Sequence, residues 1–479
     1  MEYEIVVGLE VHAELNTKTK IYCGCKNAFG NEVNTNCCPV CLGLPGALPT
    51  LNKTVVDYAI KMGHALNCKI NRISKQDRKN YFYPDTPKAF QISQFDVPLC
   101  ENGYIDAIID ENGNTKRFGV TRIHIEEDAG KLIHDDCFEG SLVDFNRSGV
   151  PLIEIVSEPD MRSSADAKAY LDTIKSILEY IGISDCKMQE GSIRCDVNVS
   201  VMPKGSDTFG TRVEMKNVNS FSGIVRAIEY ESKRQIELIE DGGTVSQETR
   251  RWDDLKGESF LLRTKEDAQD YRYFPEPDLL TISVSEDEVE KLKNSLPELP
   301  NKRISRYMSD YKLPLFDANL LMENRDKAVL FEECMETKQC QPKSITNWIL
   351  GDVSRILNEK NITLKDTKLN AKNLIDMIAL IESGKISNAS GKIIIEEIMF
   401  EDKSPLDIVK EKGLMQISDS SALEELVRGV LAQNEKAVVD FKNGKTNVVG
   451  FLVGQCMKLS KGQGNPNVLK EIMLKELEK

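Results

Sequence analysis

The chain has 479 residues, which is more than one hydrophobic core usually organises, so we expect two or three domains. Its 41% apolar and 29% charged residues are typical of globular proteins, and no apolar run approaches the roughly 18 residues that span a bilayer, which argues against a membrane protein. A formal net charge of −14 argues against a general nucleic-acid coat but leaves room for a local basic surface.

The N-terminal segment, MEYEIVVGLEVHAEL, alternates polar and apolar residues, which predicts a strand with one open face. Glu10 and His12 are two residues apart in this segment, so their side chains should point to the same side. The segment has neither a basic start nor a continuous apolar run. We therefore expect no secretory signal and a cytoplasmic location.

Five of the thirteen cysteines fall between Cys23 and Cys41. Cys23 and Cys25 form one close pair, Cys38 and Cys41 form another, and two such pairs are typical of a tetrahedral Zn²⁺ site. The first pair is tighter than the usual spacing, and Cys37 could replace Cys38. A site closed by four thiolates leaves no position for water, so its role would be structural. The isolated cysteines are expected to be reduced and packed in cores: Cys68, Cys100, Cys137, Cys186, Cys195, Cys334, Cys340 and Cys456.

Beyond the cysteines, Asn-Gly pairs predict turns, period-two alternation predicts strands, and Ser and Gly caps predict two helices. Together they predict a mixed α+β domain that ends near Pro297 or Pro300. In chain order, these elements are turns at Asn102-Gly103 and Asn112-Gly113, a helix from Ser163 or Ser164 to Gly182, strands at 192–201 and 212–216, and a helix from about Gly223 to the Gly242-Gly243 pair.

The rest of the chain shows helical spacing of apolar residues, with a break near 403–405. We therefore predict three parts: a strand-rich domain at 1–296, a helical domain at 297–403 and a small helical tail at 404–479. From Phe441 to Lys479 the chain carries seven Lys against three Glu, so its end is locally cationic. The predicted helices are 345–358, 371–383, 392–399, 420–434 and 468–478.

Acidic residues gather in two further segments. TRIHIEEDAGK contains Glu126, Glu127 and Asp128, and PLIEIVSEPD contains Glu154 in an apolar run. Mg²⁺ prefers oxygen ligands with an occasional imidazole, and such a cluster can hold ATP phosphates during phosphoryl transfer. The alternative is a solvated acidic face. Glu154 fits that alternative least, because its apolar neighbours indicate burial and buried carboxylates need a partner or a metal.

Two loops, Asp77–Gln94 and Asp270–Asp278, mix basic, aromatic and proline residues. Such loops can stack on a base and contact phosphate, although well-packed irregular loops have the same composition. The sequence has no phosphate-binding G-x-x-x-x-G-K-[ST] loop, no dinucleotide G-x-G-x-x-G after a strand and no G-x-S-x-G elbow. It also has no Ser-Ser-Lys amidase nucleophile and no N-terminal Cys for glutamine hydrolysis.

At these segments the chain resembles the B subunits of aspartyl/glutamyl-tRNA(Asn/Gln) amidotransferases, the GatB/GatE family. The resemblance is dense over the first ~290 residues and continues into FLVGQCMKLSKGQGNPN near the end. An archaeal branch, GatE, carries an inserted domain for which the roughly twenty residues between Asp278 and Pro300 leave no room, so the GatB type is favoured. The matching segments are VVGLEVHAEL, CPVCLGLPGALP, DRKNYFYPDTPKAFQISQ, TRIHIEEDAGK, NRSGVPLIEIVSEPD, EGSIRCDVNVS, EMKNVNSF, QETRRWD and DYRYFPEPDLL.

The resemblance implies a fold and a reaction. The fold is α+β: a strand-rich cradle domain with a mixed or antiparallel sheet, an all-α helical domain and a small YqeY-like tail that binds tRNA. The reaction is that of a ligase: ATP phosphorylates the side-chain carboxylate of Glu-tRNA(Gln) or Asp-tRNA(Asn), and ammonia then displaces phosphate. The ammonia comes from glutamine hydrolysed on a partner amidase (GatA), and a small third subunit (GatC) completes the heterotrimer.

The resemblance also assigns residues. The catalytic Mg²⁺ ligands fall on His12, Glu127 and Glu154, and a second cation would be held by Glu10, Glu126 and Glu214. Structural Zn²⁺ falls on the four cysteines named above, and Lys79 and Arg194 are expected to contact ATP or substrate by their charge and position. The alternatives are a tRNA-binding scaffold without chemistry and a zinc-dependent hydrolase. The sequence leaves open whether Gln-tRNA, Asn-tRNA or both are made.

Overall fold

The computed structural model describes residues 2–134, 139–264, 270–416, 420–442, 447–460 and 464–477. The chain divides into two compact units, Met1–Ser305 and Arg306–Lys479. The predicted separation of a helical domain from a tail at 403/404 stays a prediction. Within the described ranges, none of the helices has the length and apolar character needed to cross a membrane.

The first unit is built on a nine-stranded sheet with the order β14-β13-β12-β11-β1-β10-β7-β6-β2. Its strands pair antiparallel except β12 and β13, which run parallel. This large sheet agrees with the predicted α+β class. The strands are β1 (Tyr3–Glu14), β2 (Lys69–Ile70), β6 (Cys100–Ile108), β7 (Thr115–Glu127), β10 (Pro151–Ser157), β11 (Ile193–Pro203), β12 (Val213–Lys216), β13 (Glu248–Asp253) and β14 (Glu258–Thr264).

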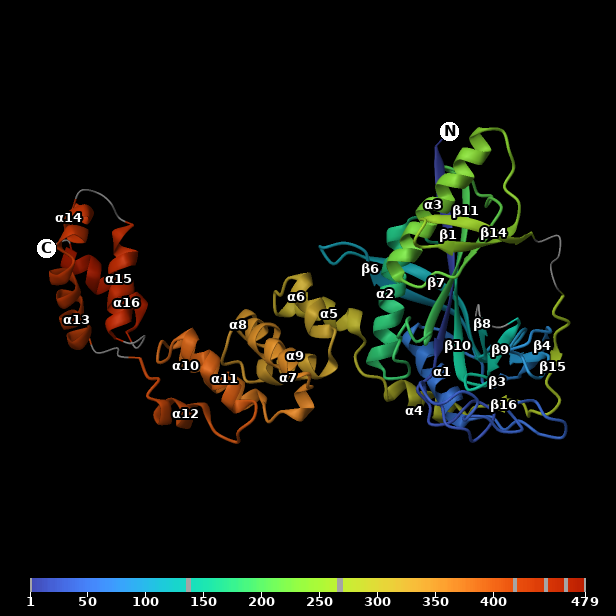
Figure 1. Cartoon of the computed structure of the whole chain (residues 1–479), viewed down its shortest axis with the longest axis horizontal. Coiled ribbons are helices and arrows are strands. Elements are labelled where there is room, and N and C mark those ends of the chain that lie inside the picture. Colours follow the sequence, from blue (N-terminus) through green and yellow to red (C-terminus); the bar gives the residue numbers. More distant parts are fainter. Residues whose placement is uncertain are drawn as a thin grey trace. The chain divides into compact units, whose positions relative to one another are not determined.

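Helices α2 (Ser164–Tyr180) and α3 (Phe221–Glu240) pack along one face of this sheet (Figure 1). Both were predicted, and each begins after a serine, Ser163 or Ser220, whose side chain accepts a backbone N–H of the first turn. The prediction of only two helices in this unit was wrong. α1 (Lys53–Ala65) is capped by Asn52 and buries an apolar stripe, and α4 (Glu286–Asn294) is a short surface helix.

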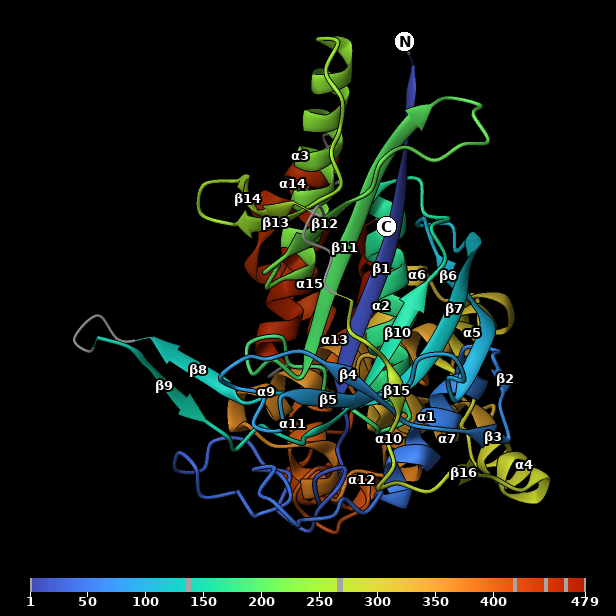
Figure 2. The same ribbon diagram turned by 90° about the vertical axis from the view of Figure 1, so that its right-hand side faces the viewer.

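The opposite face of the sheet carries polar side chains, and there strand β5 of a smaller sheet, β15-β4-β5, packs against β7. Figure 2 shows β4, β5 and β15 in front of β1 and β10, with α2 behind them. The large core lies on the helix side, so the polar face is free to build a site. The remaining strands of this unit are β3 (Ile73–Ser74), β4 (Asp77–Asn80), β5 (Phe90–Ser93), β8 (Lys131–His134), β9 (Ser141–Asp144), β15 (Phe274–Pro275) and β16 (Ile282–Ser283).

The two Asn-Gly pairs have different roles. Asn112-Gly113 forms the predicted turn between β6 and β7, and Gly113 has a φ of 80°. The turn predicted at Asn102-Gly103 was wrong, because both residues lie inside β6. A Cβ on Gly103 would lie 2.3 Å from the sulfur of Cys68, so glycine is needed there for close packing rather than for a turn.

The second unit is helical in its described residues. The predicted helix at 345–358 is interrupted by a π-helical stretch at Ile349–Val353. α13, α15 and α16 supply a separate core, and α12 packs instead on α10 and α11. The helices are α5 (Pro300–Asp310), whose first residues belong to the first unit, α6 (Leu315–Met322), α7 (Arg325–Glu336), α8 (Pro342–Trp348), α9 (Ser354–Lys360), α10 (Ala371–Glu382), α11 (Asn388–Ile398), α12 (Pro405–Lys412), α13 (Ser420–Gln433), α14 (Glu435–Lys442), α15 (Val448–Leu459) and α16 (Pro466–Leu477), with a 3₁₀ turn at Leu364–Asp366.

Candidate active site

A row of ionisable residues crosses four neighbouring strands on the polar face of the large sheet. His12 on β1 lies opposite Glu154 on β10 and opposite Arg194 on β11. Glu154 in turn lies opposite His124 on β7. Residues paired directly across antiparallel strands point to the same face, so the register brings together side chains from four separate segments.

The two histidines and two of the acids form one hydrogen-bonded group. His12 Nε2 lies 3.1 Å from Oε2 of Glu154, and His124 Nε2 lies 3.1 Å from Oε1 of Glu126. His124 Nε2 is also 3.5 Å from Oε2 of Glu154. Glu126 and Glu154 are only 2% and 7% exposed, so neither belongs to a solvated acidic face.

The electrostatics of this group keep both acids ionised. Burial opposes ionisation, but the neighbouring His124 and His12 hold the pKa of Glu154 well below its usual range. Burial and the charge of Glu154 likewise oppose ionisation of Glu126, yet His124 lowers the pKa of Glu126 to about 2. Despite its own burial, the adjacent acids raise the pKa of His124 to about 9. The acids are therefore charged at neutral pH and available to a cation.

The geometry of three of these side chains suits a divalent metal. One ligand atom each from His12, Glu126 and Glu154 lie within 4.8 Å of one another. Two carboxylates and an imidazole form a donor set that Mg²⁺ accepts. Ser93 donates to Glu126 at 2.6 Å, so one acid is already oriented by a neighbour on β5.

Glu127 lies elsewhere. It follows Glu126 directly on β7, and successive residues of a strand point to different sides. Its carboxylate accepts hydrogen bonds from Lys88 and from the backbone N–H of Ile92, the latter at 2.9 Å. The structure thus brings Glu126, rather than Glu127, to His12 and Glu154. A metal-binding role for Glu127 stays a prediction.

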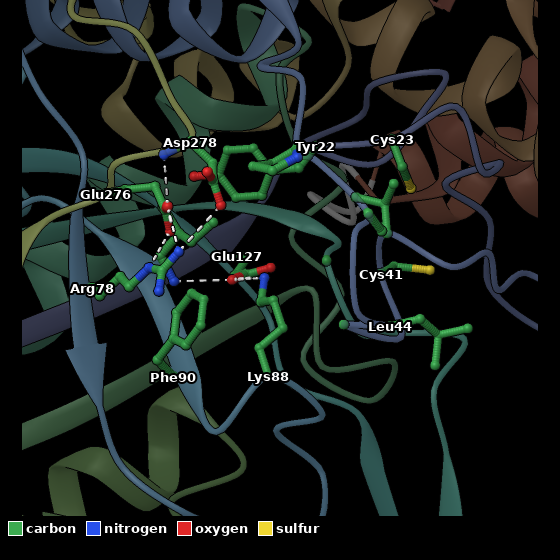
Figure 3. A pocket seen from close by; sticks show the side chains of 16 residues that line it. Tyr22, Cys23, Cys41, Leu44, Arg78, Lys88, Phe90, Glu127, Glu276 and Asp278 are labelled. Atoms are coloured by element: carbon green, nitrogen blue, oxygen red, sulfur yellow. Dashed lines mark hydrogen bonds and ion pairs between the residues drawn. The ribbon is translucent and has the colours of Figure 1, made fainter.

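Glu127 lines a cavity of about 180 Å³ between β4–β5 and the segment that carries the clustered cysteines (residues 23–41). Figure 3 shows Lys88 pointing at Glu127, and Arg78 between Glu276 and Asp278. Cys41 and Leu44 lie on another wall of the cavity (Figure 3). The ion pair of Glu127 and Lys88 therefore lines the same cavity as Cys23 and Cys41.

The residues predicted for a second cation are not gathered in one place. Glu10 accepts from Asn198 at 2.9 Å, and burial raises its pKa, helped by the charge of Glu154. Glu214 is held by Lys216 at 3.0 Å and by Thr249 at 2.8 Å. Within the described ranges, the metal-suited groups contain neither Glu10 nor Glu214. A second cation site therefore also stays a prediction.

The two predicted phosphate-binding cations differ in their surroundings. Arg194 donates to Asp128 at 2.6 Å and is therefore already paired. The ammonium group of Lys79 lies 5.1 Å from the ring centroid of Tyr271. Although burial opposes it, the charge of Glu126 raises the pKa of Lys79, which stays positive beside the acids.

Sequence reasoning missed His124 and Lys88. His124 stands two residues before Glu126 in a segment that contains period-two alternation, and this signal could have placed it on the same face. Lys88 lies in a loop, and no pattern in the sequence relates it to Glu127 on a strand. Only the three-dimensional fold brings these residues together.

The four cysteines form a second candidate metal centre. The sulfurs of Cys23, Cys25, Cys38 and Cys41 lie within 4.8 Å of one another, and the last two are 3.9 Å apart. Sulfurs that share a Zn²⁺ at about 2.3 Å are about 3.8 Å apart, so the spacing fits a closed structural site. Cys37 points instead toward Asn146, with its sulfur 3.9 Å from the amide oxygen.

The environment of this centre favours the thiolate form at Cys41 only, because the hydrogen bond with Cys41 raises the pKa of Cys23 and burial raises the pKa of Cys25 to about 11. A hydrogen bond from Cys23 lowers the pKa of the Cys41 thiol to about 4, and Cys38 contributes its backbone N–H at 3.1 Å. The ammonium group of Lys20, which is fully buried, adds positive charge nearby. Of the isolated cysteines, Cys137 lies outside the described residues, and the other seven are buried, as predicted.

Replacing Cys38 by serine should remove bound zinc, whereas replacing Cys37 by serine should not. The two residues are adjacent, but only Cys38 belongs to the cluster. We expect the Cys38 variant to lose its zinc and to melt at a lower temperature, because a structural metal stabilises the fold that binds it. Metal analysis of the purified variants, with thermal melts, measures both effects. Zinc retained by the Cys38 variant would contradict the assignment.

Comparison with known proteins places these features in a family. Residues 5–290 match the model of the GatB/GatE catalytic domain, and residues 329–477 match that of the GatB domain. A relative from Caldicellulosiruptor saccharolyticus is 56% identical over the whole of both chains, and one from Thermoanaerobacter sp. is 53% identical over the same extent. A relative from Clostridium botulinum is 50% identical, again over full length. All three carry the name of the B subunit of aspartyl/glutamyl-tRNA(Asn/Gln) amidotransferase.

Proposed function

Because the chain belongs to the GatB/GatE family, we propose that it is the B subunit of a tRNA-dependent amidotransferase and carries the ATP-dependent step. The substrate is Glu attached to tRNA(Gln), Asp attached to tRNA(Asn), or both. A side-chain carboxylate oxygen of that amino acid attacks the γ-phosphorus of ATP, and ADP leaves. Ammonia then attacks the carbonyl carbon of the acyl phosphate, and inorganic phosphate leaves.

One observation carries this proposal: the group formed by the half-buried His12 and the buried Glu126 and Glu154 on the polar face of the sheet. These residues would hold Mg²⁺, which supplies charge stabilisation for phosphoryl transfer when bound. Glu127, assigned by resemblance, is the competing third acid. His124 and Ser93 orient the carboxylates through hydrogen bonds.

Ammonia must come from elsewhere, since the sequence has no recognisable glutamine-hydrolysing nucleophile. We propose that a partner amidase (GatA) supplies it and that a small third subunit (GatC) completes the complex. The relatives are named as one subunit of an amidotransferase, which supports an assembly of several different chains.

The proposal is tested by co-expressing the chain with both partner subunits. Glu-tRNA(Gln) and Asp-tRNA(Asn) are then assayed separately with ATP, Mg²⁺ and either glutamine or ammonia. Amide formation on at least one charged tRNA, dependent on ATP, is expected. A complex that binds charged tRNA and forms no amide with any donor would instead favour a scaffold without chemistry.

Removing the C-terminal tail should weaken binding of charged tRNA. The last 39 residues are locally cationic, and Lys side chains that contact phosphates supply much of the affinity for nucleic acid. Truncation after Gly413, where α12 ends, preserves the packing of α12 on α10 and α11. We expect KM for charged tRNA to rise about tenfold or more, with glutamine hydrolysis by the complex largely unchanged. An unchanged KM at physiological salt would refute a role of the tail in tRNA binding.

A further inference from the structure

Arg122 lies on the same face of the large sheet as the candidate active site. It is a residue of β7, two positions before His124, and it pairs with Val156, which in turn pairs with Glu10 on β1. Strands are about 4.8 Å apart, and residues two apart along a strand are separated by about 6.8 Å. An arginine side chain at this position is therefore long enough to reach over the row of histidines and acids.

The guanidinium of Arg122 has no partner within the part of the chain that the structure describes. Its side chain is half-buried, and its Nε is shielded from solvent without a hydrogen bond. Two other cations on this face each donate to a carboxylate, although Nε of Arg194 is also shielded without a hydrogen bond. Arg194 donates to Asp128 at 2.6 Å, and Lys216 donates to Asp196 at 2.5 Å. A shielded N–H group without an acceptor costs free energy. Its presence in Arg122, beside a candidate active site, therefore points to an external anion.

The chemistry of this residue favours phosphate. A guanidinium presents a planar fork of N–H donors that matches two oxygens of a phosphate group. The sequence lacks a glycine-rich phosphate loop, so phosphate binding here depends on side-chain cations. The adjacent acids suit a metal, and metal and cation together hold the phosphates in known phosphoryl-transfer sites.

We propose that Arg122 binds a phosphate group of a substrate at the metal-binding face. The inference rests on the proposed function and extends it, because it assigns the phosphate contact to a residue outside the acid–histidine group. Two substrates carry phosphate: ATP and the acceptor end of the charged tRNA. The position of Arg122 beside His124, and so beside the metal-suited group, favours ATP.

The test compares Arg122→Gln and Arg122→Lys with wild type in the complete complex of all three chains. KM for ATP, KM for charged tRNA and kcat are measured separately, with ammonia as donor. We expect Arg122→Gln to raise KM for ATP about tenfold or more and to change KM for tRNA less than about twofold. Arg122→Lys keeps the charge but not the fork, so it should recover part of the loss.

Arg117→Gln is the matched control. Arg117 lies on the same strand, is exposed and is paired with Asp106 at 2.8 and 2.9 Å, so its loss should leave both KM values unchanged. Glutamine hydrolysis and thermal melts report whether each variant assembles. If the Arg122→Gln variant does not assemble, the KM for ATP of the Arg122→Lys variant tests the proposal instead.

The possible results distinguish the source of the phosphate, the role of Arg122 and the proposed function. A rise confined to KM for charged tRNA supports phosphate binding and assigns the phosphate to the acceptor end. Unchanged KM values for both substrates in an assembled Arg122 variant overturn the inference. A wild-type complex that forms no amide contradicts the proposed function itself, whereas an active wild type with an unaffected Arg122→Gln variant contradicts only the role of Arg122.

Discussion

Replacing Glu154 by glutamine should lower amide formation by about two to three orders of magnitude or more, even when ammonia is supplied directly. Glutamine keeps the size of the side chain but removes the negative charge that contacts His12 at 3.1 Å and His124 at 3.5 Å. A neutral amide is a poor ligand for Mg²⁺ beside these histidines. The amide formed on charged tRNA is measured, with glutamine hydrolysis by the same complex as the internal reference.

Glu158→Gln is the control for this variant. Glu158 belongs to the same segment but is exposed, and its side chain accepts a hydrogen bond from Thr121 at 2.8 Å. It should retain wild-type amide formation. Thermal melts show whether loss of the Glu154 charge has unfolded the sheet. An assembled Glu154→Gln complex with wild-type amide formation would remove this acid from the mechanism.

Replacing Glu126 and Glu127 singly by glutamine should give different Mg²⁺ requirements. One carboxylate oxygen of Glu126 lies within 4.8 Å of ligand atoms of His12 and Glu154. Glu127, in contrast, is bound by Lys88 beside a separate cavity. We expect Glu126→Gln to raise the Mg²⁺ concentration needed for half-maximal activity more than about tenfold. Glu127→Gln should leave that concentration within about twofold of wild type, whatever its effect on the rate.

The two variants act as controls for each other, because the residues are adjacent on β7 and both are buried. Rates of amide formation across a Mg²⁺ titration provide the measurement. The opposite pattern, with the metal requirement changed only by Glu127→Gln, would support the ligand set implied by the family resemblance. It would also mean that Glu127 leaves Lys88 when the metal binds.

Local patterns predicted much of the first unit. The alternation around Glu10 and His12 correctly predicted β1. Ser163, with the apolar spacing after it, correctly predicted α2. These predictions hold because a strand face and a capped helix are determined by neighbouring residues. The helix α1 was missed among strands, although its apolar residues recur at helical spacing. The turn predicted at Asn102-Gly103 was wrong because packing against Cys68, rather than a turn, requires the glycine.

The candidate site was harder to predict, because it depends on contacts between distant segments. Period-two spacing put Glu10 and His12 on one face, but only pairing across β1, β10 and β7 shows that Glu154 and His124 join them. Strand alternation puts Glu126 on the face of His124 and Glu127 on the other side, but only the fold shows that Lys88, from a loop, binds Glu127. For the cysteines the spacing indicated two close pairs, and the fold then distinguishes Cys38, which lies in the group, from Cys37, which points toward Asn146.

The central claim is that this chain activates the side-chain carboxylate of the charged tRNA with ATP. It is tested most directly by measuring ADP formation by the complex of all three chains without glutamine or ammonia. We predict ADP formation that requires charged tRNA, is absent with uncharged tRNA, and is lost in Glu154→Gln while glutamine hydrolysis persists. ADP formation that is independent of charged tRNA, or that Glu154→Gln leaves intact, would contradict the account.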